Sequence, residues 1–186
     1  MCRSSATLFY IPDQERSMTY HEHRTKAKKE LKFGILTVST SRYGAGRPED
    51  LAGDLAKQLI KTKKHKVVRR AIVPDSIIKI RKKVLEILED VDVLVITGGT
   101  GASKTDVTLE AIKPIWDKEM PGFGEAFRME GYKKIGSPAL LSRAAMGVLG
   151  GKIILCLPGS PDGVKLGLEI IMDELPHLKF VLEENT

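Results

Sequence analysis

Short apolar runs alternate with longer, mostly polar stretches along most of this chain. The runs lie at residues 34–38, 67–73, 91–96 and 152–157 and are rich in valine, isoleucine and leucine. Apolar runs of this length predict buried strands. Between the runs, apolar residues recur every three or four positions, as at 49–61, which predicts helices.

Two further helices are predicted at 77–88 and at 105–116, where Pro114 disturbs the second. Strands that alternate with helices indicate a mainly parallel sheet that is covered on both faces. The sequence therefore predicts a single three-layer α/β/α domain.

The second half of the chain is less regular. We interpret residues 120–124 as a break, followed by two short helices around 124–134 and 138–146. The last helix opens at residues 160–162, where a capping serine, a proline and an acidic residue follow one another. Its apolar face is predicted to extend over residues 164–175.

Residues 1–32 show no such regularity. We predict a polar arm there, lying on the surface or on a neighbouring subunit, and an α/β domain at residues 33–186. His21 and His23 suggest a metal site, but they would share a face only on a strand and have no third ligand nearby, so exposed histidines are favoured.

Composition restricts the partners of this protein. The chain has 186 residues, which suits one domain, and no apolar run approaches the roughly 20 residues that span a bilayer. Its net charge is +6, but the densest basic run, Lys61–Lys66, contains no aromatic residue, so neither nucleic-acid nor membrane binding is expected. Cys2 lies in the predicted arm and Cys156 in an apolar run, so we expect no disulfide and a reducing cytoplasm.

Each predicted strand ends in small, polar or backbone-permissive residues. In a parallel sheet the carboxyl ends of the strands meet at one edge, where helix N-termini also point and where ligands bind. The four turns should therefore converge on one crevice. They contain Ser39-Thr40, Pro74-Asp75, Gly98-Gly99-Thr100-Gly101 and Pro158-Gly159-Ser160.

The turn Gly98–Gly101 is the clearest candidate for an anion site. Its three glycines let backbone N–H groups approach a phosphate, and Thr100 adds a hydroxyl. A tight turn that only requires positive φ is the alternative. The segment through Thr105 resembles a P-loop, but Ser103 stands where that motif requires glycine, which excludes an ordinary P-loop NTPase.

Asp75 and Asp106 are the carboxylates at these turns. Each precedes a predicted helix and could serve as its N-cap, which contributes about 0.5–2 kcal/mol. Two carboxylates beside a glycine turn also suit Mg²⁺ held against phosphates, and one residue can do both. His65 and His177 sit beside charged surface segments and form no Ser-His-Asp triad, which favours positioning and charge neutralisation over covalent catalysis.

An ordered set of motifs gives the chain a specific resemblance. The motifs are Thr97–Gly101, Asp106–Thr108 with Glu110-Ala111, Met120–Glu125, Leu141–Ala144 and Leu157–Pro161. With this order and nearly uniform spacing between about residues 33 and 180, the chain resembles the MoaB/MogA family of molybdenum-cofactor biosynthesis proteins, and His21–Arg24 resembles MoaB-type members.

This resemblance implies a Rossmann-like fold that assembles as a homotrimer or homohexamer. It also implies an enzyme that uses ATP and Mg²⁺ to adenylylate the terminal phosphate of molybdopterin, releasing pyrophosphate, with a downstream metal-insertion enzyme as partner. By resemblance, Asp75 and Asp106 are the catalytic acids and the Mg²⁺ ligands. The residues that it implies contact nucleotide or pterin are Ser39, Gly98, Gly99, Thr100, Gly101, Ser142, Pro158, Gly159 and Ser160.

Two positions depart from the family pattern and bear on catalytic efficiency. Thr40 stands where many members have Asp, and Lys104-Thr105 precede Asp106 where many members have Arg directly before the acid. A non-catalytic molybdopterin-binding or scaffold protein is therefore the alternative, and action on another nucleotide is a third reading. The arm and Phe123 are the candidate subunit contacts.

Overall fold

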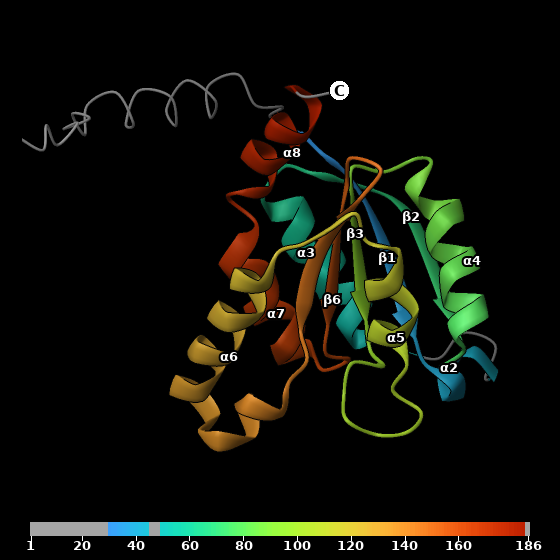
Figure 1. The fold of residues 1–186 in the computed structure, drawn as a ribbon, viewed down its shortest axis with the longest axis vertical. Helices are drawn as coiled ribbons and strands as arrows, with labels where there is room; N and C mark the ends of the chain where they lie inside the picture. The colour runs from blue at the N-terminus through green and yellow to red at the C-terminus, as the bar shows by residue number, and fades with distance from the viewer. Residues whose placement is uncertain (1–29, 45–48, 185–186) are drawn as a thin grey trace, which may run out of the picture.

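A computed structural model of the chain describes residues 30–44 and 49–184. Within these residues a six-stranded sheet has the order β2-β1-β3-β6-β5-β4 (Figure 1). Strands β2, β1, β3 and β6 are parallel, and β5 and β4 are added antiparallel at one edge. The strands are β1 (Lys32–Val38), β2 (Lys66–Val73), β3 (Val93–Thr97), β4 (Lys118–Glu119), β5 (Ala145–Leu149) and β6 (Lys152–Leu157).

Helices cover both faces of this sheet and confirm the three-layer prediction. Helices α3, α6 and α7 bury the face that contains Phe33 and Leu155, while α4 and α5 bury the face that contains Leu36 and Ile154 (Figure 1). The helices are α2 (Thr40–Gly44), α3 (Leu51–Thr62), α4 (Ile77–Leu88), α5 (Thr108–Ile112), α6 (Pro121–Ile135), α7 (Pro161–Ile171) and α8 (Leu175–Glu184).

A buried carboxylate ties the start of α3 to the end of β1. The side chain of Asp50 caps α3 by accepting from Gly53 N at 3.0 Å. It also accepts from Thr37 Oγ1 at 2.7 Å and pairs with Arg70 at 3.3 Å. Because Thr37 is the last residue but one of β1, these bonds fix the end of this strand, from which the first predicted site turn emerges.

The predictions for residues 120–146 are wrong in two places. Residues 120–124 do not break the chain, because α6 begins at Pro121 and continues through both glycines of this segment. Gly124 allows close packing instead, since a Cβ there would lie 2.7 Å from the Ala144 carbonyl oxygen. Phe123 is buried among the core side chains, with 4% of its surface exposed, so it is not the surface side chain that a subunit contact requires.

The short helix expected at 138–146 is also absent among the described residues. A 3₁₀ turn at Ser137–Leu141 is followed by β5, which forms a hairpin with β6. Gly150 and Gly151 make this hairpin possible, because both adopt positive φ. The chain thus adds an antiparallel edge that strand-like apolar runs alone did not indicate.

Two predicted helices are shorter than expected. Only residues 108–112 of the predicted 105–116 segment are α-helical, and a 3₁₀ turn at 113–115 contains Pro114. The last predicted helix ends at Ile171, and a separate helix, α8, begins at Leu175.

The structure also bears on the predictions for the cysteines, the histidines and membrane-spanning segments. Cys156 is free and buried in β6. His65 is not a surface residue, because it is 7% exposed and stacks on Phe33 with ring centroids 5.3 Å apart. No helix in residues 30–44 and 49–184 is long and apolar enough to span a membrane. Cys2, His21, His23 and all but the last three residues of the predicted arm lie outside the described residues.

Candidate active site

The glycine turn after β3 lies against the ends of β1 and β6. Gly98 and Gly99 have φ values of 93° and 63°, a region that favours glycine. A Cβ on Gly98 would lie 2.4 Å from the Val38 carbonyl oxygen, and one on Gly159 would lie 3.2 Å from Gly98 Cα. The turns that follow the carboxyl ends of β1, β3 and β6 therefore contact one another through their backbones. They meet where the strand order reverses, between β1 and β3, which is the usual ligand position in such sheets.

Asp75 faces this turn from the end of β2. A Cβ on Gly99 would lie 3.3 Å from Asp75 Oδ1. Asp75 Oδ2 accepts from Thr40 N at 2.8 Å and from Thr40 Oγ1 at 2.7 Å, and Asp75 N donates to Thr40 Oγ1 at 3.0 Å. Thr40 thus holds one carboxylate oxygen while the other is turned towards the glycine turn.

Asp106 lies at the other end of the same turn. A Cβ on Gly101 would lie 2.7 Å from Asp106 Oδ2, and this oxygen also accepts from Ser103 N at 3.0 Å. Neither acid caps a helix, since Ser76 precedes α4 and Val107 precedes α5. The capping interpretation is therefore wrong, and both carboxylates are available for another role.

The other predicted site residues divide into two groups. Ser39 and the segment 158–160 lie at the same edge as the acids, where Ser39 N donates to Val73 O at 2.9 Å. Ser160 also caps α7, because its Oγ accepts at 3.2 Å from the N–H three residues later, as its sequence position predicts. Thr100, within the turn itself, is 3% exposed, so its hydroxyl is not open to an anion as the sequence predicted. Ser142 lies apart from this group, on the wall of a cavity.

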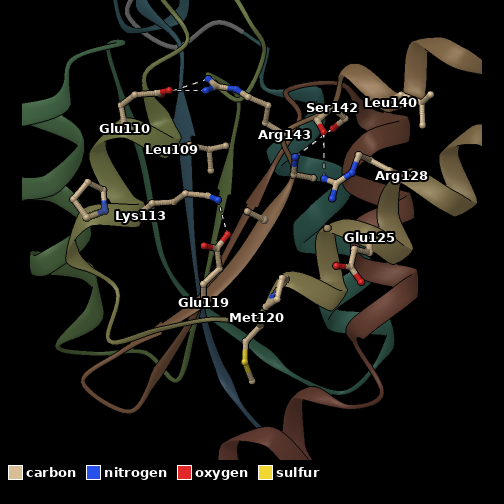
Figure 2. A pocket seen from close by; sticks show the side chains of 15 residues that line it. Leu109, Glu110, Lys113, Glu119, Met120, Glu125, Arg128, Leu140, Ser142 and Arg143 are labelled. Carbon is tan, nitrogen blue, oxygen red and sulfur yellow. Dashed lines mark hydrogen bonds and ion pairs between the residues drawn. The ribbon is translucent and has the colours of Figure 1, made fainter.

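This cavity has a volume of about 550 Å³ and lies between α5 and α6, beside the β4–β5 edge (Figure 2). In Figure 2, Glu110 and Lys113 project from one side, and Glu125 and Arg128 lie on the other. Arg143 lies at one end. The volume is within the usual range for small-molecule sites, roughly 300–1,000 Å³.

Most of the cations in this cavity are paired with carboxylates. Lys113 pairs with Glu119, and Arg143 pairs with Glu110. The hydrogen bond from Arg143 holds the pKa of the Glu110 carboxyl below its usual range. Within the described part of the chain, Arg128 has no carboxylate partner and donates only to a backbone carbonyl, at 3.5 Å. Arg128 is thus the wall cation best placed to receive an anion.

The roles of Arg128 and Arg143 in this cavity were not predicted from the sequence. Arg143 lies inside the quoted motif Leu141–Ala144, and Arg128 follows the motif that ends at Glu125 by three positions. The sequence does not show that Arg143 is paired and Arg128 is not. The partner of Arg143 is Glu110, which lies 33 residues away along the chain.

A family model and curated proteins match this chain over most of its length. The family model is described as "Probable molybdopterin binding domain" and matches residues 34–177. The "Molybdenum cofactor biosynthesis protein B" of Bacillus cereus is 43% identical over 169 residues, which cover 89% of this chain and 98% of that protein. A "Molybdopterin adenylyltransferase" of Pyrococcus furiosus is 41% identical over 167 residues, which cover 87% and 96%.

Solved structures show the same fold. A crystal structure of molybdenum cofactor biosynthesis protein B is 42% identical with a TM-score of 0.78, covering 86% of this chain and 99% of that one. The tungsten cofactor synthesizing protein MoaB from Pyrococcus furiosus is 39% identical with a TM-score of 0.75, covering 85% and 98%.

Proposed function

This chain belongs to the MoaB/MogA family of molybdopterin-binding domains, and we propose that it adenylylates molybdopterin in molybdenum-cofactor biosynthesis. In this reaction an oxygen of the terminal phosphate of molybdopterin attacks the α-phosphorus of ATP. The bond between the α-phosphorus and the α–β bridging oxygen breaks, and pyrophosphate leaves with that oxygen. The chain is then a nucleotidyltransferase, and the use of ATP fits a cytoplasmic location.

One observation carries this proposal: two carboxylates flank a glycine turn at the carboxyl edge of the sheet. Asp75 Oδ1 faces Gly99, and Asp106 Oδ2 faces Gly101. Because these positions carry no side chains, the acids can lie against the turn, and backbone N–H groups of such a turn are suitable donors to a phosphate chain. Transfer between two anions requires their charges to be offset, and fixed groups at such an edge do so without reorganising during the reaction.

The two acids are suited to hold Mg²⁺. This ion is usually bound through one or two carboxylates and completes its shell with water and substrate phosphates. Among the described residues, no hydrogen bond engages Asp75 Oδ1 or Asp106 Oδ1, and no cluster of three or more His, Cys, Asp or Glu forms a closed metal site. We therefore assign Asp75 and Asp106 as ligands. When bound, Mg²⁺ would neutralise phosphate charge at the transfer site.

We assign molybdopterin to the cavity between α5 and α6. Its volume suits a small molecule, and Arg128 offers a cation without a carboxylate partner in the described chain. Ser142 lies on the wall of the cavity, and the next residue, Arg143, contacts the loop of Asp106. ATP would then lie against the glycine turn, with Ser39, Thr100 and the segment 158–160 nearby.

Asparagine variants of the two acids test the proposal. Asp75→Asn and Asp106→Asn keep the shape of each side chain and remove its charge. We expect pyrophosphate release to fall by roughly 100-fold or more, while the Kd for molybdopterin stays near that of the wild type. Asp90→Asn is the control, because Asp90 pairs with Arg69 at the opposite edge of the sheet. Wild-type rates in both active-site variants would remove the acids from the mechanism.

A non-catalytic molybdopterin carrier is the second candidate, and Thr40 favours it. The site has a hydroxyl where many family members have a carboxylate, which leaves one fewer possible Mg²⁺ ligand. Saturable binding of molybdopterin by the wild type, without an adenylylated product in the presence of Mg·ATP, would establish the carrier. ATP-dependent turnover only with a non-pterin substrate would instead indicate another nucleotidyl transfer.

We also propose that the chain forms a homotrimer or homohexamer through α6 and the 3₁₀ turn after it. This surface exposes large apolar side chains in a continuous segment, which marks an interaction surface. Light scattering should show a trimer or hexamer, and Ile135→Glu should yield a smaller species; a monomeric wild type would contradict this assignment. The exposed side chains are Met129, Tyr132, Ile135, Leu140 and Leu141.

A further inference from the structure

We propose that Arg143 is a positioning residue of the adenylyl transfer, which holds in place the loop that carries Asp106. The proposal rests on the function proposed above and assigns a role to a side chain outside the two acids and the glycine turn. It follows from the contacts of one guanidinium group.

Arg143 spans both ends of the segment between the glycine turn and Asp106. Its Nε donates to the Thr100 carbonyl oxygen at 3.2 Å, and its Nη2 donates to the Asp106 carbonyl oxygen at 3.1 Å. Nη1 and Nη2 also donate to the two carboxylate oxygens of Glu110 on α5 (Figure 2). One rigid fork therefore joins the start of the loop, its end and the following helix.

The loop has few other attachments among the described residues. Residues 102–105 are exposed, and the hydrogen bonds within the segment join Ser103 to Asp106 and to Thr105. Helix α5, which follows, has only five residues and lacks a side-chain cap at Val107. The loop is tied at its base by Thr108, which donates to the carbonyls of the glycine turn. Arg143 supplies the hydrogen bonds that join the two ends of the loop.

The same contacts distinguish positioning from substrate binding. Although Arg143 lines the cavity, its donors are directed at two carbonyls and a carboxylate, so little remains for a substrate anion. Arg128, which donates to the Ser142 carbonyl oxygen, has no carboxylate partner in the described chain. Loss of Arg143 should therefore displace Asp106 and slow the reaction, whereas loss of Arg128 should weaken binding. A displacement of about 1 Å at a reacting group can lower a rate by as much as 100-fold.

Arg143→Lys tests the assignment, because lysine keeps the charge but loses the fork. Arg81→Lys is a matched control. Arg81 also clamps two carbonyls, with Nε donating to Ala111 O at 2.7 Å and Nη2 donating to Glu110 O at 3.2 Å, but it holds the far end of α5 and not the loop. Each variant loses a guanidinium fork between two carbonyls, and Arg143→Lys also loses the two bonds to Glu110, so its melting temperature should fall at least as far as that of Arg81→Lys.

We expect Arg143→Lys to lower kcat roughly 10- to 100-fold with little change in KM for molybdopterin, while Arg81→Lys retains the wild-type kcat. Amide hydrogen exchange of residues 101–107 should accelerate in Arg143→Lys and not in Arg81→Lys. A normal kcat in Arg143→Lys, or an effect confined to KM, would overturn the positioning role. If the wild type makes no adenylylated product, the proposed function fails, and unchanged exchange of the loop in Arg143→Lys would still refute the clamp independently.

Discussion

Replacing Thr40 with valine tests how Asp75 is oriented. Valine keeps the branched shape of threonine but removes the hydroxyl that donates to Asp75 Oδ2 at 2.7 Å and accepts from Asp75 N at 3.0 Å. The bond from Thr40 N, at 2.8 Å, remains. A hydrogen bond to a charged group contributes about 1.5–3 kcal/mol. Because Asp75 is half-buried, water replaces part of this bond, and we expect the lower end of the range.

An effect of about 1.4 kcal/mol on the transition state corresponds to a tenfold lower rate. We therefore expect kcat for pyrophosphate release to fall about tenfold in Thr40→Val, and the Mg²⁺ concentration for half-maximal rate to rise, because Asp75 Oδ1 is no longer held towards the glycine turn. Initial rates measured over a Mg²⁺ titration, at saturating ATP and molybdopterin, give both quantities. Thr40→Ser retains the hydroxyl and should remain near the wild type. A Thr40→Val variant with unchanged kcat and Mg²⁺ dependence would refute this reasoning.

Three further predictions concern the glycine turn and the buried side chains of His65 and Cys156. In Gly99→Ala, the added Cβ would lie 2.4 Å from Thr108 Oγ1, at a residue with φ of 63°. Pyrophosphate release should therefore fall by roughly tenfold or more, and the melting temperature should drop. Full activity of this variant would contradict the close fit. Burial lowers the pKa of His65 below 6.5, so the unfolded chain takes up the proton first, and the free energy of unfolding should decrease as pH falls below about 6.5. In urea titrations from pH 8 to 5.5, His65→Asn, which can still accept from Leu31 N, should lose less stability than the wild type, and equal losses would contradict the assignment. Burial raises the pKa of Cys156 to about 12, so iodoacetamide at pH 8 should label it only in urea, as read by peptide mass spectrometry; rapid labelling of the folded protein would contradict its burial.

The sequence was sufficient to predict the parallel part of the fold, because its signals are local. Apolar runs identified β1, β2, β3 and β6, and the residues after each run indicated that four turns share an edge. The start of α7 also followed from local chemistry, since the hydroxyl of Ser160 caps it. These features depend on side chains within a few positions of one another.

The antiparallel edge could not be predicted in the same way. Glycines in residues 120–124 indicated a break, yet Gly124 serves the approach of α6 to Ala144. Gly147 likewise makes room for Trp116, since a Cβ there would lie 2.2 Å from the indole ring. A glycine that permits packing and a glycine that ends a helix look alike until the neighbouring segment is known.

In the candidate site, too, the features with local sequence signals were predicted and the contacts between distant residues were not. The glycine turn and both acids were predicted from the sequence, and in the structure each acid lies against the turn. The partners that orient the acids were not predicted, because Thr40 lies 35 residues from Asp75 and Arg143 lies 37 residues from Asp106. Only the folded chain shows that Thr40 orients the carboxylate of Asp75.

The fate of the α-phosphate of ATP tests the central claim most directly. The wild type and Asp106→Asn would each be incubated with molybdopterin, Mg²⁺ and ATP labelled at the α-phosphorus, and the pterin would then be separated and counted. We predict one label per pterin with the wild type, one pyrophosphate released for each label transferred, and almost none with Asp106→Asn. Unlabelled molybdopterin in both samples, or equal labelling by the variant, would contradict nucleotidyl transfer at this pair of acids.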